Sequence, residues 1–245
     1  FCDPAHTKAM ALRIKKAGMK FLLDFHYSDF WADPAKQYMP AAWKGLSLPD
    51  LIRAVHDFAW KVLSELRSQG TLPDMVQIGN EINHGILWPI GTMDHPDTLA
   101  RLLKAGLSAV REMDTSIITM LHIACGGQNK ESRDFLDKMI ARGVRFDVIG
   151  ESYYPRWHGT TEELRETLPA LASRYPQAII VVEYSQKKQE VNDIVFSLPD
   201  EKGRGTCIWE PLSWGETLFD KDGKANALLS LYPAIRNQYI GGRRR

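Results

Sequence analysis

The stretch MVQIGNEINHG, residues Met75–Gly85, changes from apolar to polar character in its middle. Val76 and Ile78 have the character of a buried strand, whereas Asn80 and Glu81 follow only two and three positions later. A carboxylate at the end of an apolar strand is costly to desolvate unless it is paired or takes part in chemistry. The stretch therefore predicts a buried strand whose carboxyl end carries a functional group.

The same order of apolar strand and amphipathic helix repeats along the chain. Strands are predicted over residues 19–25, 74–80, 116–123, 146–153, 178–184 and 205–210. Helices are predicted over residues 7–18, 51–70, 98–112, 131–142, 161–175, 189–198 and 225–236. Continuous apolar strands that alternate with helices indicate a parallel sheet covered on both faces. We predict an α/β fold with a single domain over residues 1–240, followed by a tail over 241–245.

Composition excludes several classes of function. The net charge of +1 gives no electrostatic reason to expect a nucleic acid or an anionic membrane as partner. No apolar run approaches the roughly 20 residues that span a bilayer, and three cysteines are too few for a disulfide framework or a zinc cluster. The histidines lack the HExxH spacing, and no GxGxxG or P-loop is present. We therefore expect neither a metal nor an organic cofactor.

Polar and aromatic residues follow every predicted strand. The strand ends read Asp24-Phe25-His26-Tyr27-Ser28-Asp29, Asn80-Glu81, His122, Ser152-Tyr153-Tyr154, Glu183-Tyr184 and Trp209-Glu210. Barrel enzymes build their active sites at the carboxyl ends of the strands, and open doubly wound sheets bind ligands there as well. Six such ends in succession predict one binding or catalytic site.

Two carboxylates stand out among these residues, Glu81 and Glu183, because each directly follows an apolar strand. Glycoside cleavage needs such a pair, a proton donor for the leaving oxygen and a nucleophile for the anomeric carbon. The alternative is that both side chains are structural partners of ion pairs. Tryptophans in the loops after the strands favour a sugar site, and Trp31, Trp88 and Trp209, together with Asp29, are predicted to bind substrate.

Longer motifs make the similarity specific. The segments LLDFHYSDFWADPAKQ, PAAWKG, VQIGNEINHGILWP, IGESYYPRWHG, VVEYSQ and WEP resemble the arabinogalactan endo-β-1,4-galactanases of glycoside hydrolase family 53. The likeness runs from about Cys2 to Tyr232. It implies a TIM-barrel-type (β/α)8 fold and a retaining mechanism, with the acid/base on strand 4 and the nucleophile on strand 7.

The resemblance also implies roles for individual residues. Glu81 in GNE is the expected acid/base, and Glu183 in VVE is the expected nucleophile. Asn80 is expected to hold the sugar 2-hydroxyl, and Tyr153 to form a hydrogen bond with the nucleophile. The galactose at the cleavage point is expected to contact three further residues, His26, His122 and Trp209.

The sequence departs from the family pattern in two places. Its six strands correspond to strands 3 to 8 of the family, so the expected barrel is incomplete and lacks the first two strands. The loop after Glu183, YSQKKQE, is shorter than in members whose loops 7 and 8 bind calcium, which argues against a metal here.

The leading hypothesis is a retaining endo-β-1,4-galactanase that acts on pectic galactan. The alternatives are a related enzyme acting on β-mannan or β-glucan, and a galactan-binding fragment with impaired catalysis. Two open strand edges predict a homodimer or other homo-oligomer. A polymeric substrate predicts a secreted or periplasmic protein, although the chain shows no signal peptide.

Overall fold

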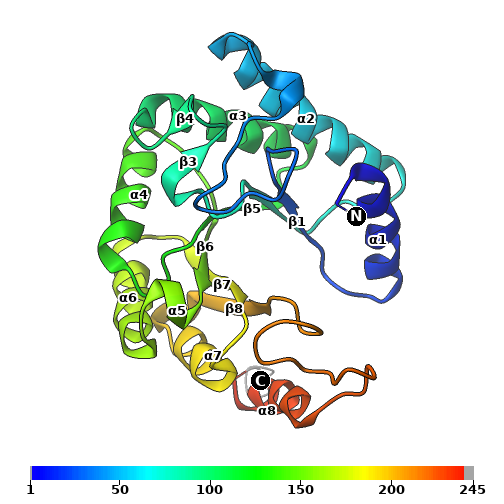
Figure 1. Ribbon diagram of the computed structural model, residues 1–245, viewed down its shortest axis with the longest axis vertical. Coiled ribbons are helices and arrows are strands. Elements are labelled where there is room, and N and C mark those ends of the chain that lie inside the picture. The colour runs from blue at the N-terminus through cyan, green and yellow to red at the C-terminus, as the bar shows by residue number, and fades with distance from the viewer. Residues whose placement is uncertain (1, 240–245) are drawn as a thin grey trace. The chain divides into compact units, whose positions relative to one another are not determined.

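Alternating strands and helices build the chain as predicted. A computed structural model describes residues 2–239, and the predicted tail, 241–245, lies outside them. Within this range the main sheet has six strands in the order β1-β2-β5-β6-β7-β8 (Figure 1), and the registers of β1 with β2, β2 with β5 and β7 with β8 are parallel. Their bounds are β1 Leu22–Phe25, β2 Met75–Ile78, β5 Ile118–Ile123, β6 Val148–Tyr153, β7 Ala178–Tyr184 and β8 Gly203–Ile208.

The helices begin where local capping groups allow. Asp3, Ser47 and Thr160 each accept a hydrogen bond from a backbone N–H of the first turn, which satisfies an otherwise unpaired donor. The α-helices are α1 Pro4–Lys16, α2 Leu48–Ser68, α3 Pro96–Met113, α4 Asn129–Ala141, α5 Pro155–His158, α6 Thr161–Arg174, α7 Lys188–Phe196 and α8 Leu231–Tyr239. Every predicted helix is present, with ends shifted by a few residues, except that α8 begins later because Ala227–Ser230 form a 3₁₀ turn.

Two short features were not predicted. A hairpin of β3 (Gly85–Ile86) and β4 (Gly91–Thr92) follows the site strand β2, and the one-turn helix α5 follows β6. Gly85 has φ +102, and a Cβ there would meet the carbonyl of Gly91, so the hairpin depends on this glycine. Two-residue strands are too short to show an alternation of polar and apolar residues in the sequence.

The described chain divides into two compact units. The first unit comprises the chain up to His122 together with Asp134–Val148, and the second comprises Ile123–Arg133 together with the chain from Ile149 onward. The prediction of a single domain over 1–240 stays a prediction. No helix within residues 2–239 is both long and apolar enough to cross a membrane.

In the first unit, α2 and α3 pack together beside β1 and β2 (Figure 1). The buried side of α2 carries an apolar stripe, which includes Leu51, Val55 and Leu63. Gly106 brings α3 close to β2, because a Cβ there would lie 2.9 Å from the Ile78 side chain. This packing fixes the strand that ends at Glu81.

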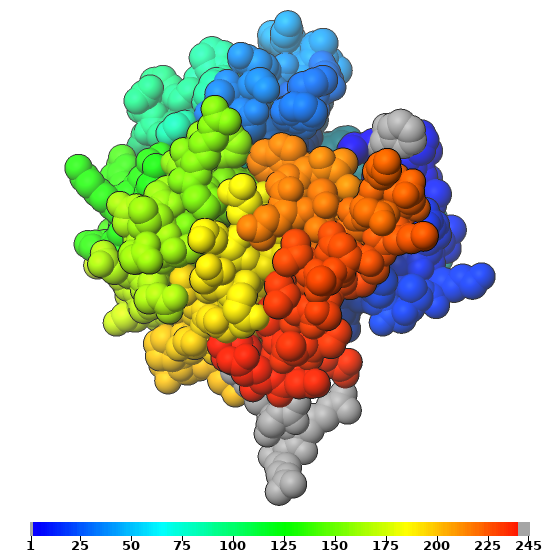
Figure 2. Space-filling view, turned by 60° about the horizontal axis from the view of Figure 1, so that its bottom comes forward, coloured from blue at the N-terminus to red at the C-terminus, as the bar shows by residue number. Residues whose placement is uncertain are grey.

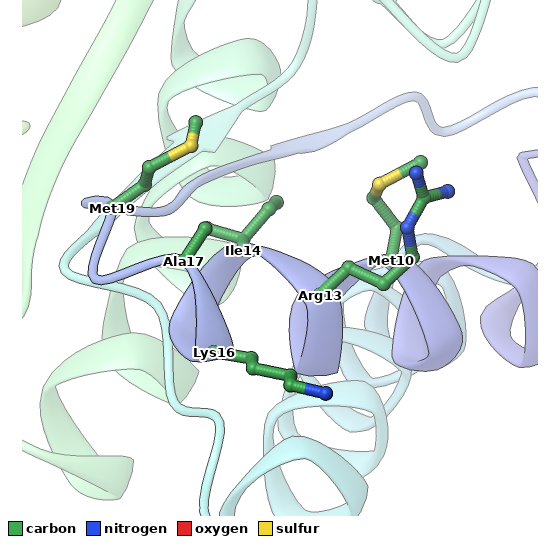
Figure 3. A pocket seen from close by; sticks show the side chains of 6 residues that line it. All are labelled: Met10, Arg13, Ile14, Lys16, Ala17 and Met19. Carbon is green, nitrogen blue, oxygen red and sulfur yellow. The ribbon is translucent and has the colours of Figure 1, made fainter.

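Helix α1 exposes apolar side chains in the same unit. Met10 and Leu12 of the helix, and Met19 shortly after its end, are all exposed. A hollow along the helix is lined by Met10, Arg13, Ile14, Lys16, Ala17 and Met19, and Figure 3 shows the side chains of Met10, Ile14 and Met19 on one side of the helix, with Lys16 on the other. The face is therefore apolar with a basic border.

In the second unit, β7 pairs with β8 and α7 packs against β8. The approach is close at Gly203, where a Cβ would meet the carbonyl oxygen of Val195. The strand β7 carries Ile179 and Val181 into the core and ends with Glu183 and Tyr184. This places the second predicted carboxylate on a firmly packed strand.

Candidate active site

Glu81 lies directly after β2 in an unusual backbone conformation. Its φ and ψ are 50° and 52°, which lie in the left-handed region, and the residue is only 7% exposed. A non-glycine residue in this region stores strain of about 1–3 kcal/mol, and such residues cluster at functional sites. The backbone therefore turns at the cost of strain where the predicted acid/base sits.

The buried side chain of Gln37 holds this turn. Its Nε2 donates to the carbonyl oxygen of Asn80 at 2.7 Å and to that of Glu81 at 3.3 Å. A buried amide that donates to two consecutive carbonyls restricts the peptide between them. Gln37 was not among the predicted site residues, because nothing in the local sequence distinguishes it from a surface glutamine.

Asn80 and His122 are brought together, as the predicted site requires. Asn80 Oδ1 lies 2.8 Å from His122 Nδ1 and 3.2 Å from Gln77 Nε2, and all three residues are buried. Asn80 Nδ2 donates to the Ala32 carbonyl at 2.9 Å. The amide orientation is thereby determined, and the second hydrogen on Nδ2 is available to a sugar hydroxyl.

His26 is fixed by the same loop. The backbone N–H of Ala32 donates to His26 Nδ1 at 2.8 Å, so the ring proton is on Nε2, which lies 2.8 Å from Asp24 Oδ2. Ala32 thus connects His26 and Asn80 through its N–H and its carbonyl. Both ring nitrogens of His26 therefore have protein partners, which fix the orientation of the ring.

The other candidates of the first unit lie nearer the surface. Trp31 is 62% exposed, packs beside Phe30, and has the Lys36 ammonium 5.3 Å from its ring centroid. Asp29 accepts the Ala41 N–H at 2.7 Å and so supports the loop that carries Trp31.

Trp88 is also positioned by hydrogen bonding and ring contact. It donates from Nε1 to the His84 carbonyl at 3.1 Å, and its ring packs edge-on against Tyr38. These exposed and half-exposed rings are suited to pack against the apolar faces of sugars.

Glu183 has a different tyrosine partner from the one predicted. The Tyr154 hydroxyl donates to Glu183 Oε1 at 2.6 Å, whereas the Tyr153 hydroxyl donates to the Gly159 carbonyl at 3.2 Å. The prediction that Tyr153 contacts the nucleophile is therefore wrong.

Strand alternation explains the correction. Glu151 shares a face of β6 with Tyr153, and its carboxylate contacts Ser132 of α4 at 3.0 Å and the backbone N–H of Cys125 at 3.2 Å. Because side chains alternate along a strand, Tyr154 belongs to the opposite face. Burial raises the pKa of Glu151 to about 8.

His158 holds the backbone of Tyr154 through a hydrogen bond. Its Nδ1 accepts the Tyr154 backbone N–H at 3.1 Å, and burial lowers the pKa of His158 to about 4, so the ring is neutral at pH 7. The Tyr154 ring is edge-on to both Trp157 and Trp214, and those two indoles are parallel within 9° at 6.2 Å. Trp209 is 47% exposed, and its backbone N–H donates to the Tyr184 carbonyl at 2.8 Å.

A parallel α/β sheet with two carboxylates directly at its strand ends, one of them hydrogen-bonded to a tyrosine, is typical of the class of barrel-type glycoside hydrolases. Within that class, the chain belongs to glycosyl hydrolase family 53, whose family profile matches residues 1–193. The six strands form a partial barrel of this family, as predicted.

Relatives support this membership. An endo-beta-1,4-galactanase from Bacillus subtilis is 34% identical over 224 residues, which cover 90% of this chain and 48% of that protein. An uncharacterized protein in the bgaB 5′ region of Niallia circulans is 50% identical over 191 residues, or 75% of this chain and 52% of that protein. The chain thus spans about half the length of these two curated relatives.

Solved structures agree with the fold. The GH53 catalytic domain from Ignisphaera aggregans superposes with a TM-score of 0.89 at 31% identity, over 96% of this chain and 79% of that one. A psychrophilic family 10 endo-beta-1,4-xylanase superposes with a TM-score of 0.66 at 15% identity, over 94% and 81%, which shows similarity of fold alone.

Proposed function

We propose that the chain is the catalytic part of a retaining endo-β-1,4-galactanase, with Glu81 as acid/base and Glu183 as nucleophile. The observation that carries the proposal is the Tyr154–Glu183 hydrogen bond, since a donor at 2.6 Å orients this carboxylate for attack. Family membership and the names of the galactanase relatives supply the substrate class.

The proposed reaction has two steps. Glu81 donates a proton to the glycosidic oxygen while Glu183 attacks the anomeric carbon. The glycosidic bond breaks, which gives a covalent glycosyl-enzyme and releases the remaining part of the polysaccharide with a new hydroxyl group. Glu81 then removes a proton from water, the water oxygen replaces Glu183, and the anomeric configuration is retained. Asn80 is proposed to donate to the 2-hydroxyl, with His26, His122 and Trp209 around the same sugar. A polymeric substrate also favours a secreted or periplasmic location.

The test compares reducing-sugar release from galactan, β-mannan and β-glucan. We expect release from galactan, with retention of configuration by proton NMR. Preference for mannan or glucan would support a related clan enzyme instead. Binding to galactan without release from any polymer would support the galactan-binding alternative.

Replacing either catalytic carboxylate tests the assignment. We expect Glu81→Gln and Glu183→Gln each to lower galactan turnover by about 10³-fold or more with an unchanged circular dichroism spectrum, because an amide neither donates the proton nor attacks. Azide should restore turnover of Glu183→Ala by forming a glycosyl azide of inverted configuration. Near-normal turnover of either glutamine variant would contradict the assignment.

A further inference from the structure

Lys188, the first residue of α7, carries its ammonium group into the protein interior. Its side chain is 1% exposed, and Nζ donates to the Ser185 carbonyl at 2.5 Å and lies 3.4 Å from Glu216 Oε2. Burial lowers the pKa of Lys188, and the Glu216 carboxylate acts in the opposite direction. A buried ammonium is costly unless it is paired, so a role for this lysine should be sought in what it holds.

The partner segment is pressed against the turn between β7 and α7. The Glu216 N–H donates to the Ser185 carbonyl at 3.3 Å, and the Lys187 N–H donates to Glu216 Oε1 at 3.4 Å. Gly215 has φ +67, and a Cβ there would meet the Ser185 hydroxyl group. Figure 2 shows the segment around residue 215, in orange, beside the yellow region of α7. Lys188 and Glu216 thus join two segments about 30 residues apart in sequence.

The joined segment carries Trp214 to the tyrosine of the site. The Trp214 ring packs edge-on against Tyr154, with centroids 5.2 Å apart, and stacks on Trp157. Tyr154 in turn donates to Glu183. A continuous series of contacts therefore runs from Lys188 through Glu216, Trp214 and Tyr154 to Glu183.

We propose that Lys188 is a positioning residue for the reaction: with Glu216 it fixes the 211–218 segment so that Trp214 holds Tyr154 in hydrogen-bonding position on Glu183. The inference rests on the proposed function for its catalytic part, whereas the fixing of the segment does not depend on any activity. A lysine that merely fills space would affect stability without a specific link to Tyr154.

The structural part is tested by hydrogen exchange and mass spectrometry on the full chain. Glu216→Gln is the main variant, because this side chain is 42% exposed and its amide is tolerated on the surface. Lys188→Met removes the buried charge while keeping the length of the side chain. Lys187→Met is the matched control, since the Lys187 side chain is exposed and its ammonium group pairs with Glu190 in the first turn of α7.

We expect peptides over residues 210–218 to exchange at least 10-fold faster in Glu216→Gln and Lys188→Met than in Lys187→Met. Peptides over β7 should be unchanged, because its ladder with β8 does not involve these side chains. Equal exchange of 210–218 in all three variants would overturn the proposal. This measurement needs no turnover, so it shows whether Lys188 and Glu216 fix the 211–218 segment even if the chain proves inactive on galactan.

The catalytic part is tested by a double-mutant cycle with Tyr154→Phe. We expect Glu216→Gln to lower kcat about 5- to 10-fold in the wild-type background, with KM changed less than 2-fold. In the Tyr154→Phe background it should lower kcat less than 2-fold, because the group through which it acts is gone. Equal effects in both backgrounds, or no effect in either, would show that Lys188 and Glu216 do not act through Tyr154.

Discussion

At the scale of single residues, Tyr154 holds the carboxyl group of the proposed nucleophile through a hydrogen bond. Tyr154→Phe removes a charge-assisted hydrogen bond worth about 1.5–3 kcal/mol, so kcat/KM on galactan should fall about 10- to 100-fold. Steady-state kinetics measures the effect. Tyr153→Phe is the matched control, because its hydroxyl contacts the Gly159 carbonyl instead, and its kcat/KM should stay within about 3-fold of wild type. Equal losses in both variants would contradict the corrected assignment.

Glu151 makes stability depend on pH. Its folded pKa of about 8 lies above the ordinary 4.5, so the folded state binds more protons than the unfolded state between these values. Stability should therefore fall as pH rises from about 4.5 to 8, by on the order of 4 kcal/mol from this group. Urea unfolding at pH 5 and pH 8.5 measures the change.

Glu151→Gln should remove most of that dependence. A glutamine oxygen can accept the Cys125 N–H, its nitrogen can donate to the Ser132 hydroxyl, and that hydroxyl can donate to the Cys125 carbonyl, already 3.3 Å away. The variant should therefore be more stable than wild type at pH 8.5 and similar to it at pH 5. The same pH slope in both proteins would show that Glu151 does not titrate in this range.

At the scale of elements, Asp74 fastens α1 and β1 to the loop before β2. Its carboxylate accepts from Lys15 and the Phe21 N–H at 2.7 and 2.9 Å, and from Lys20 at 2.8 Å. Burial acts to raise the pKa of Asp74, but these three donors together hold it well below its usual range. The group therefore stabilises the fold above about pH 4, and this stabilisation is lost as pH falls further.

Asp74→Asn should lower the free energy of unfolding at pH 7 by about 1–3 kcal/mol, because an amide accepts fewer and weaker hydrogen bonds from the two ammonium groups. Urea denaturation measures the difference, which should shrink below pH 4. Asp57→Asn on the exposed face of α2 is a suitable control and should change stability by less than about 0.5 kcal/mol. A difference independent of pH would exclude the ionic explanation.

The order of strands and helices was predictable, because each main-sheet strand is a run of mostly apolar residues and each long helix repeats apolar residues on one face. The same patterns did not reveal α5 or the β3–β4 hairpin, which contain too few residues for a period to show. The choice between Tyr153 and Tyr154 failed for a related reason. Every residue of β6 is buried, so polarity gives no phase, and only the partner of Glu151 shows which face each tyrosine occupies.

The residues of the candidate site also fall into those that the sequence predicted and those that it did not. Asn80, Glu81, His122 and Glu183 were predictable because they end apolar strands. Gln37, Lys188 and Glu216 were not, since they come from loops and helix starts and act through contacts distant in sequence. Such residues carry no local pattern that separates a buried amide or ammonium from an exposed one.

At the scale of the whole molecule, we predict a homodimer. The strand order leaves β1 and β8 at the ends of the sheet, and the apolar face of α1 is exposed. Both features favour association, although the basic residues bordering α1 oppose it. Light scattering at micromolar concentration should give twice the chain mass of 27.8 kDa at low and moderate salt. A mass of 27.8 kDa together with full activity would contradict the prediction.

The left-handed backbone of Glu81 places thermal stability and catalytic activity in conflict at this position. Glycine adopts this conformation without strain, so Glu81→Gly would relieve part of the stored energy while deleting the proposed proton donor. Laboratory evolution that selects only for thermal stability would therefore favour replacements of Glu81 that stabilise the fold and abolish catalysis. Stabilising libraries built on this chain should keep residue 81 constant and seek their gains elsewhere.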